Sequence, residues 1–208
     1  MKKKPFTLVE LLIAMSVLSV FLLGLMQFYT TTEDVMSAGA NRTELFERAR
    51  VAMDMMANDL TCMYYSQTDE NMIPFEYTGK SFKVATIRPE KLQNSAKTSI
   101  IGAQYSFDAS GRKLTYAFDS NKDGVFSVKD ASFGGAETLV EGVTDFSVTA
   151  NIQSGLSIPD TVLIRMELVD GKTLKRLEAG AFSEPPKETR REFRRLVVID
   201  RGQRKIKH

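Results

Sequence analysis

KKKPFTLVELLIAMSVLSVFLLGLMQFY, residues 2–29, is the stretch that decides the fold. Three lysines open it, and from Phe6 to Thr32 the only charged residue is Glu10. The 22 residues from Leu8 to Tyr29 suffice, at about 1.5 Å each in a helix, to cross a hydrocarbon core of about 30 Å. The stretch therefore predicts a membrane-spanning helix over residues 8–29.

A secretory signal peptide also combines a basic start with an apolar stretch. Its apolar region usually holds about 7–15 residues and ends at a cleavage site of small residues. The apolar stretch here is longer, and it continues through Thr30–Asp34 into a further helical pattern. We therefore expect it to stay as an anchor. The basic leader, residues 1–5, should keep the N-terminus in the cytoplasm and send the rest of the chain across the membrane.

Glu10 is the one carboxylate in this apolar segment. An acidic residue at the bilayer centre costs about 2.5–3.5 kcal/mol on insertion scales. Glu10 lies six residues after Lys4, so it should sit near the headgroups, where the cost is smaller. Two interpretations stay open: the side chain reaches to the interface, or it pairs with a cation brought by a neighbouring subunit.

A second helical pattern follows the apolar segment. From Asn41 to Met63 apolar residues recur at spacings of three and four, and charged residues fill the other faces. One continuous helix over about residues 6–62, with a bend near Gly39, is the simplest prediction. Asn41 and Glu44 also resemble a helix-capping pair, so a division into two helices there is the alternative.

Beyond Met63 the pattern changes to the alternation that is typical of β-strands. Hairpin turns are expected at Asp108–Gly111 and Asp170–Gly171, and exposed loops at residues 89–98 and 183–189. The expected strands are residues 75–77, 81–87, 101–107, 113–118, 138–149, 161–169 and 192–199.

These patterns together predict an α+β fold with few helices after the first. The long N-terminal helix, with its membrane half and its amphipathic half, should pack on an antiparallel β-sheet. The sheet domain would span residues 63–200, which is long enough to bury an ordinary core, and residues 201–208 would form a basic tail.

The segment Phe6-Thr7-Leu8-Val9-Glu10-Leu11-Leu12-Ile13-Ala14 resembles the N-terminal signature of type IV pilins and type II secretion pseudopilins. The resemblance implies a pilin-like fold, cleavage before Phe6 by a prepilin peptidase and N-methylation of the new amine. It also implies that Glu10 meets the amino terminus of an adjacent subunit during assembly. That family usually has glycine before the cut, where this chain has Pro5. An uncleaved chain would leave Phe6 without a free amine and Glu10 without that partner.

Later segments resemble, more loosely, the J-type minor pseudopilins of type II secretion. This resemblance implies a structural subunit at or near the tip of a short periplasmic pseudopilus, anchored in the bacterial inner membrane before assembly. Other pseudopilins, the prepilin peptidase, the inner-membrane assembly platform and secreted proteins would be its partners. A minor pilin of a type IV or competence pilus is a close alternative. The similar segments are residues 48–60, 139–148, 158–162 and 193–199.

Asp119–Asp130 has the spacing of a twelve-residue calcium loop. Calcium binds about six to eight hard oxygens, which such a loop supplies at alternate positions around a central glycine, here Gly124. A polar hairpin turn on Asp123-Gly124 is the alternative. If Ca²⁺ binds, it should stiffen the loop, and a singly anchored calcium-dependent binding module that never assembles becomes a second hypothesis. The ligands would be Asp119, Asn121, Asp123, the carbonyl of Val125, Ser127 and Asp130.

Composition argues against several other functions. The formal net charge of +2 gives no reason to expect a nucleic-acid partner. The only histidine is His208, and no glycine-rich phosphate loop is present, so we do not expect an enzyme. The single cysteine, Cys62, excludes an intrachain disulfide. Basic residues gather between Arg190 and Lys207, which predicts either a solvated cationic face or a docking surface for an acidic partner or anionic lipid.

Overall fold

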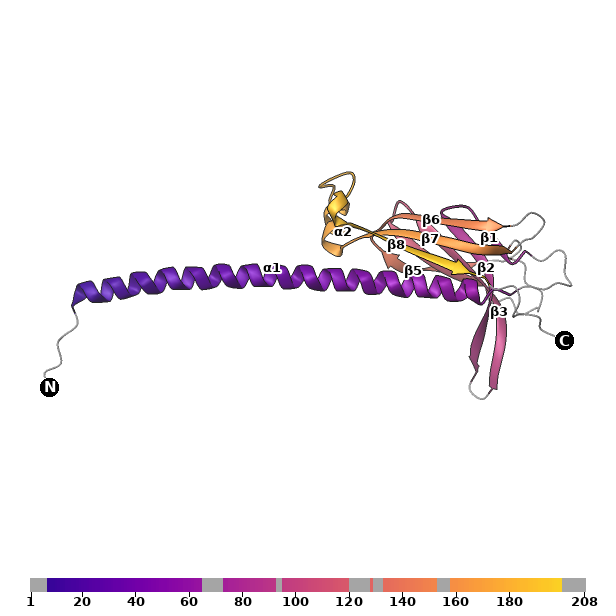
Figure 1. Ribbon diagram of the computed structural model, residues 1–208, viewed down its shortest axis with the longest axis horizontal. Helices are drawn as coiled ribbons and strands as arrows, with labels where there is room; N and C mark the ends of the chain where they lie inside the picture. The colour runs from indigo at the N-terminus through magenta and orange to yellow at the C-terminus, as the bar shows by residue number, and fades with distance from the viewer. Residues whose placement is uncertain are drawn as a thin grey trace. The chain divides into compact units, whose positions relative to one another are not determined.

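The computed structural model describes residues 7–64, 73–92, 95–119, 128, 133–152 and 158–199, with the backbone alone for residues 88–92 and 95–99. The chain divides into two units, Met1–Glu44 and Leu45–His208, each of which is described by itself. Figure 1 shows the helices and strands, most of them labelled by their number in chain order.

The first element is one long helix, α1, Leu8–Thr61. Residues 39–44 are helical throughout, so the predicted continuous helix is confirmed and the alternative of two helices is wrong. Glycine in a helix costs about 1 kcal/mol relative to alanine, a small amount for a helix of 54 residues. A Cβ on Gly39 would meet nothing within 4 Å, so neighbouring atoms do not require a glycine there.

Five antiparallel strands form the first sheet, in the order β1-β2-β3-β4-β5. The predicted turn at Asp108–Gly111 is confirmed, since it joins β3 to β4. The Asp108 carboxylate accepts hydrogen bonds there from the Ser110 N–H at 3.0 Å and the Ser110 hydroxyl at 2.6 Å. The strands are β1 Phe75–Tyr77, β2 Ser81–Leu92, β3 Ser95–Asp108, β4 Lys113–Asp119 and β5 Gly134–Glu141.

Three further antiparallel strands form a second sheet, in the order β6-β7-β8. A short helix, α2, Gly171–Glu178, and a 3-10 turn, Lys187–Thr189, connect β7 to β8. The predicted α+β fold is therefore confirmed, with its β-structure divided between two sheets. The strands are β6 Val143–Ile152, β7 Pro159–Val169 and β8 Arg190–Val198.

Gly142 divides the segment that was expected to be one strand over residues 138–149. Its φ of +80° is unfavourable for residues with a side chain, and a Cβ there would lie 2.9 Å from the Val169 carbonyl oxygen. Gly142 in turn accepts a hydrogen bond from the Val169 N–H at 2.9 Å. The chain therefore leaves the first sheet at Gly142 and enters the second.

Two other local predictions are wrong. Asp170-Gly171 is no hairpin turn, because Asp170 caps α2 by accepting a hydrogen bond from the Thr173 N–H at 2.6 Å. Residues 89–98 were expected to form a loop, but β2 and β3 remain paired out to Leu92 and Ser95. Beyond Thr86 and Ile101 these two strands form a ribbon, since the pairing of β3 with β4 begins at Gly102.

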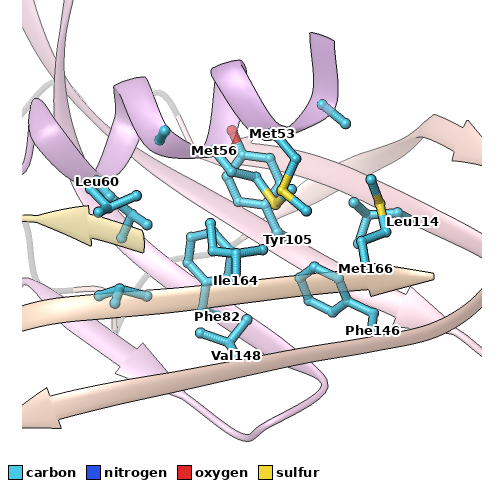
Figure 2. Packing of buried hydrophobic residues seen from close by; sticks show 14 of the residues in the cluster. Met53, Met56, Leu60, Phe82, Tyr105, Leu114, Phe146, Val148, Ile164 and Met166 are labelled. Carbon is cyan, nitrogen blue, oxygen red and sulfur yellow. The ribbon is translucent and has the colours of Figure 1, made fainter. Parts of the chain in front are cut away.

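The core of the second unit forms where the last turns of α1 meet both sheets. Figure 2 shows Met53, Met56 and Leu60 of α1 above side chains from the strands. Met56 and Leu60 have no exposed surface, so the apolar stripe of the predicted amphipathic half is the helix face that the sheets cover. The facing side chains include Phe82, Tyr105, Phe146, Val148, Ile164 and Met166.

An aromatic ladder runs across the first sheet from β1 to β4. Neighbouring ring centroids along it are 4.8–6.2 Å apart, within the range of favourable aromatic contacts. At its centre the hydroxyl of the fully buried Tyr105 donates a hydrogen bond of 2.6 Å to the fully buried Asp59 of α1. From β1 to β4, each ring of the ladder contacts the next in the sequence Tyr77, Phe75, Phe82, Tyr105, Tyr116 and Phe118.

An ion pair between Lys80 and Asp145 links the turn after β1 to strand β6. The hydrogen bond from Lys80 lowers the pKa of Asp145 below its ordinary value of 3.8. A lowered pKa in the folded state means that the ionised carboxylate stabilises the fold above the ordinary pKa, and that this stabilisation is lost as the pH falls through the folded pKa.

Removal of the Asp145 charge should therefore flatten the acid dependence of stability. We expect the urea midpoint of Asp145→Asn to fall less than that of the wild type when the pH drops from neutral to below 3.8. Glu76→Gln, which breaks another surface ion pair of the same unit, is the control. Parallel acid curves for Asp145→Asn and the wild type would contradict the expectation.

Candidate assembly site

Glu10 lies in the first turn of α1, where it forms a reciprocal cap with Thr7. The Thr7 N–H donates to Glu10 Oε2 at 2.9 Å, and the Thr7 hydroxyl donates to the same oxygen at 3.0 Å. In return the Glu10 N–H donates to Thr7 Oγ1 at 3.3 Å, and the Thr7 carbonyl accepts the first helical hydrogen bond from Leu11 at 3.3 Å. Thr-x-x-Glu is the capping-box pattern, with Thr7 as the N-cap.

This cap gives the carboxylate a partner within its own chain. Glu10 was expected either to reach the interface or to pair with a neighbouring subunit, and Thr7 was not singled out. The Thr-x-x-Glu spacing was the signal in the sequence that could have found it. The contacts with Thr7 use only Oε2.

The helix that follows Glu10 is long and apolar enough to cross a membrane. Side chains from Leu8 to Tyr29 are exposed in the unit Met1–Glu44, as expected for a surface that meets lipid or other helices. The hydroxyls of Ser16 and Ser19 donate to the carbonyls of Leu12 and Met15 at 2.8 Å, so they do not enter a hydrocarbon layer unpaired.

A polar band ends this apolar surface. The hydroxyls of Thr30 and Thr31 both donate to the Gln27 carbonyl, at 3.0 and 2.9 Å, and Thr32 donates to the Phe28 carbonyl at 2.8 Å. Glu33 and Asp34 follow at once. The predicted membrane span is therefore bounded by a segment that suits the membrane surface.

Three of the four arginines of β8 form ion pairs, and Arg191 donates a hydrogen bond to the Arg190 carbonyl at 3.4 Å. Arg190 lies 3.5 Å from Glu167 and 3.1 Å from Glu184. Arg194 pairs with Glu192 at 2.5 Å, and Arg195 pairs with Asp54 of α1 at 2.7 Å. The hydrogen bond from Arg194 lowers the pKa of Glu192, while Glu192 raises the pKa of Arg194.

These pairs favour the solvated face over a docking surface as the interpretation of β8. Carboxylates beside the arginines already neutralise much of the charge that an acidic partner or anionic lipid would meet. Strand β8 is also an edge of its sheet, where charged side chains discourage pairing with other strands. Residues 201–208 of the predicted tail lie outside the described residues.

Of the predicted calcium loop, residues 119–130, the structure describes only Asp119 and Val128. Asp119 ends β4, opposite Gly102 of β3, and Val128 is fully buried with its N–H donating to the Ile73 carbonyl at 3.0 Å. Within the described part of the chain no group of three His, Cys, Asp or Glu side chains could hold a metal. The other predicted ligands lie outside the described residues; they are Asn121, Asp123, Val125, Ser127 and Asp130.

Comparison with known proteins identifies one match. Residues 2–26 match the family model described as the prokaryotic N-terminal methylation motif. That segment contains Pro5 and Phe6, which lie outside the described residues, as well as Glu10. No curated protein and no solved structure matches the chain. The motif implies processing by a prepilin peptidase and assembly with other subunits that carry it.

Proposed function

We propose that this type IV pilin-like protein is a J-type minor pseudopilin of a type II secretion system. It acts as a structural subunit, assembles through its N-terminal helix at or near the tip of the pseudopilus, and supports the export of folded proteins. Proteins of the pilin-like class are generally not enzymes. The resemblance of residues 48–60 and 139–148 to J-type pseudopilins supports the finer assignment.

The observation that carries the proposal is the continuity of α1. The helix begins within the methylation motif, at Leu8, and ends at Thr61 without a break. Its apolar first half is exposed, whereas Ala49, Met56 and Leu60 in its last turns are fully buried in the core of the second unit. One continuous helix therefore carries both a surface for membrane or helix packing and part of the core of the folded β-domain, the unit Leu45–His208.

In this role the subunit has a location in the membrane before assembly and a defined set of partners. Before assembly the chain spans the bacterial inner membrane once, with Lys2–Lys4 in the cytoplasm and the β-domain in the periplasm. The prepilin peptidase cuts before Phe6, and Glu10 meets a cationic amino terminus of an adjacent pseudopilin. The inner-membrane assembly platform then adds the subunit, and the exported cargo contacts the growing pseudopilus.

Gene deletion in the native host tests this function. We expect loss of secreted enzymes from the medium and their accumulation in the periplasm, with restoration by the wild-type gene. Glu10→Gln should fail to restore export although it reaches wild-type levels in the membrane, and Glu33→Gln, beyond the apolar span, is the matched control. Normal export by the deletion strain would overturn the proposal.

A minor pilin of a type IV or competence pilus is the first alternative. The methylation motif favours it as much as the secretion role, because the match covers only residues 2–26. The same deletion strain separates the two: lost surface fibres, twitching or DNA uptake with normal export would assign the chain to a pilus.

An uncleaved, membrane-anchored calcium-binding module is the second alternative, and Pro5 before the cutting position favours it. Proline has a fixed φ and no N–H, which changes the backbone that a peptidase must bind. Intact-mass spectrometry of the protein from its native membrane shows whether residues 1–5 are removed. A chain that begins at N-methylated Phe6 supports assembly, whereas a chain that retains residues 1–5 supports the anchored module.

Calcium binding by residues 119–130 has its own test. A ligand present at 100 times its Kd stabilises the folded state by about 2.7 kcal/mol. We expect Ca²⁺ to raise the Tm of the detergent-solubilised full chain by several degrees, EDTA to reverse the rise, and Asp119→Ala with Asp123→Ala to abolish it. Asp108→Ala, in a turn outside the loop, is the control. An unchanged Tm in Ca²⁺ would leave a polar turn as the correct interpretation.

A further inference from the structure

We propose that the outer face of α2 is a docking surface for the anionic lipid headgroups of the membrane in which the chain is anchored. This surface consists of Lys172, Lys175 and Arg176, and we call it the α2 basic face. The inference rests on one part of the proposed function, the single membrane span before assembly. It adds a second contact with the membrane, made by the β-domain itself.

The sequence of α2 separates its cations from its buried residues. At about 100° per residue, the three cations lie within about 100° of the helix circumference, and the side chains of Thr173 and Leu177 point to the opposite side. Thr173 and Leu177 are buried, whereas all three cations are exposed. The β-domain therefore holds α2 by its less polar face, and the basic face is open to solvent.

The α2 basic face lacks the carboxylate partners that neutralise strand β8. Among the residues that the structure describes, no carboxylate oxygen lies within 4.0 Å of a charged nitrogen of this face. Arg176 instead lies over the ring of Phe182, with 5.9 Å between the guanidinium carbon and the ring centroid. Glu184, in the connection to β8, pairs with Arg190. The face thus retains its charge for an anion from outside the domain.

Helix stability explains only part of this charge. Lys175 and Arg176 lie in the last turn of α2, where a cation stabilises the negative end of the helix dipole. Lys172 is the second residue of α2, and a cation in the first turn is unfavourable for the dipole. Lys172 therefore completes a cluster of three cations at a small cost to the helix, as expected if the cluster binds an external anion.

Strand β8 runs in the same direction as α1, starting from the end of the β-domain at which α1 enters. The ring centroid of Phe193 lies 5.4 Å from that of Phe46, the second residue of α1 in this unit. Further along both elements, Arg195 pairs with Asp54. The first residues of β8 therefore lie at the entry end of the domain.

Helix α2 belongs to the same end. Val169, the last residue of β7, pairs with Arg190, the first residue of β8, and α2 lies in the connection between them. Figure 1 shows α2 just beyond these strand ends. From this end α1 continues without a break back to the apolar span. The unpaired cations are thus at the end of the β-domain that is tethered to the membrane.

The expected attraction is moderate. A basic residue close to an anionic membrane surface favours the bound state about fivefold, and the attraction falls off within a Debye length of about 8 Å. Three cations on one face can therefore favour docking by up to about a hundredfold. Such a contact suffices for a domain that α1 already anchors, and it is weak enough to break when the subunit leaves the membrane.

The experiment uses the full chain in nanodiscs, with Cys62→Ser and a fluorophore on Ala179→Cys, an exposed position at the end of α2. The nanodiscs contain phosphatidylcholine and a fixed fraction of lipid with a nitroxide on its headgroup, with or without about 30% phosphatidylglycerol. Quenching of the fluorophore reports how often α2 lies at the headgroups. We expect quenching to be at least about twofold stronger with phosphatidylglycerol, and this increase to disappear in about 0.5 M NaCl.

Two triple variants separate the α2 basic face from the net charge. Replacement of its three cations by glutamine should remove the increase that phosphatidylglycerol causes. Its urea midpoint should equal that of the wild type, because the replaced side chains are exposed. The matched control loses the same charge from ion-paired cations of the sheets and should keep the increase. The control combines Lys83→Gln, Lys113→Gln and Arg194→Gln.

The outcomes also separate the inference from the function on which it rests. Equal quenching of the wild type with and without phosphatidylglycerol would overturn the lipid contact. Equal losses in the two triple variants would overturn it as well, because they would show a response to net charge alone. Failure of the chain to insert into nanodiscs would overturn the membrane anchor itself. Normal export by the deletion strain would overturn the secretion role and leave the lipid contact in place.

Discussion

Replacement of Tyr105 by alanine should lower the free energy of unfolding of the β-domain by about 3–5 kcal/mol, the usual cost of removing a buried aromatic ring. Tyr105 has no exposed surface, and its ring lies 4.8 Å from that of Phe82 and 5.1 Å from that of Tyr116. The change also takes a hydrogen bond from the buried carboxylate of Asp59. Domains of this size have a free energy of unfolding of about 5–15 kcal/mol, so the expected loss is a large part of it.

Urea unfolding of the full chain in detergent, followed by circular dichroism, measures this loss. Tyr105→Phe, which removes only the hydroxyl, should cost about 1–3 kcal/mol. Tyr77→Ala, at the exposed end of the same ladder, should cost less than Tyr105→Ala because more than a third of Tyr77 is already in solvent. Equal losses for Tyr77→Ala and Tyr105→Ala would show that the ladder is not packed as described.

Replacement of Gly142 by alanine should cost about 3 kcal/mol or more. A positive φ in a residue with a side chain accounts for about 1–3 kcal/mol. The remainder comes from the Val169 carbonyl oxygen, only 2.9 Å from the position of the new Cβ, because neither backbone segment can move without disturbing β5, β6 or β7.

Gly79 is a matched control for this prediction. Its φ of +77° is close to the +80° of Gly142, but a Cβ there would meet nothing within 4 Å. Gly79→Ala therefore measures the cost of the backbone conformation alone, and the difference between the two variants measures the clash. If Gly79→Ala is as destabilising as Gly142→Ala in urea unfolding, the close approach to Val169 has no energetic effect.

The features that could be predicted from the sequence are those set by local patterns of many residues. The apolar run from Leu8 and the spacing of Met53, Met56 and Leu60 each repeat often enough to specify a helix and its buried face. Strand β1 was predicted with its observed bounds, and the turn at Asp108–Gly111 follows from side-chain hydrogen bonds within the turn.

The features that were missed depend on contacts between distant segments or on single residues. Residues 138–149 alternate like one strand, and the close approach of Val169 to Gly142 comes from another part of the chain. Asp170-Gly171 has the composition of a hairpin turn, yet the Asp170 side chain bonds Thr173 and starts α2. In both cases a glycine or an aspartate indicates that the chain changes direction, but it does not specify whether a hairpin turn, a helix cap or a strand break forms there.

In the candidate site, too, local features could be predicted from the sequence, whereas contacts between distant segments could not. Glu10 could be found because a lone carboxylate in an apolar run requires an explanation. The charge of β8 could be predicted, but its neutralisation could not, because Glu167 and Asp54 reach the strand from β7 and α1. Ion pairs across strands and between helix and sheet depend on the fold, so the composition of β8 alone does not predict them.

The aromatic ladder also gives this protein a built-in optical probe. The chain has no tryptophan and only six tyrosines, and three of the six, Tyr77, Tyr105 and Tyr116, are members of the ladder. Closely stacked rings in fixed orientations couple their electronic transitions, so near-ultraviolet circular dichroism should arise largely from the first sheet. A loss of that signal would therefore report melting of this sheet, while far-ultraviolet intensity would still report helix α1.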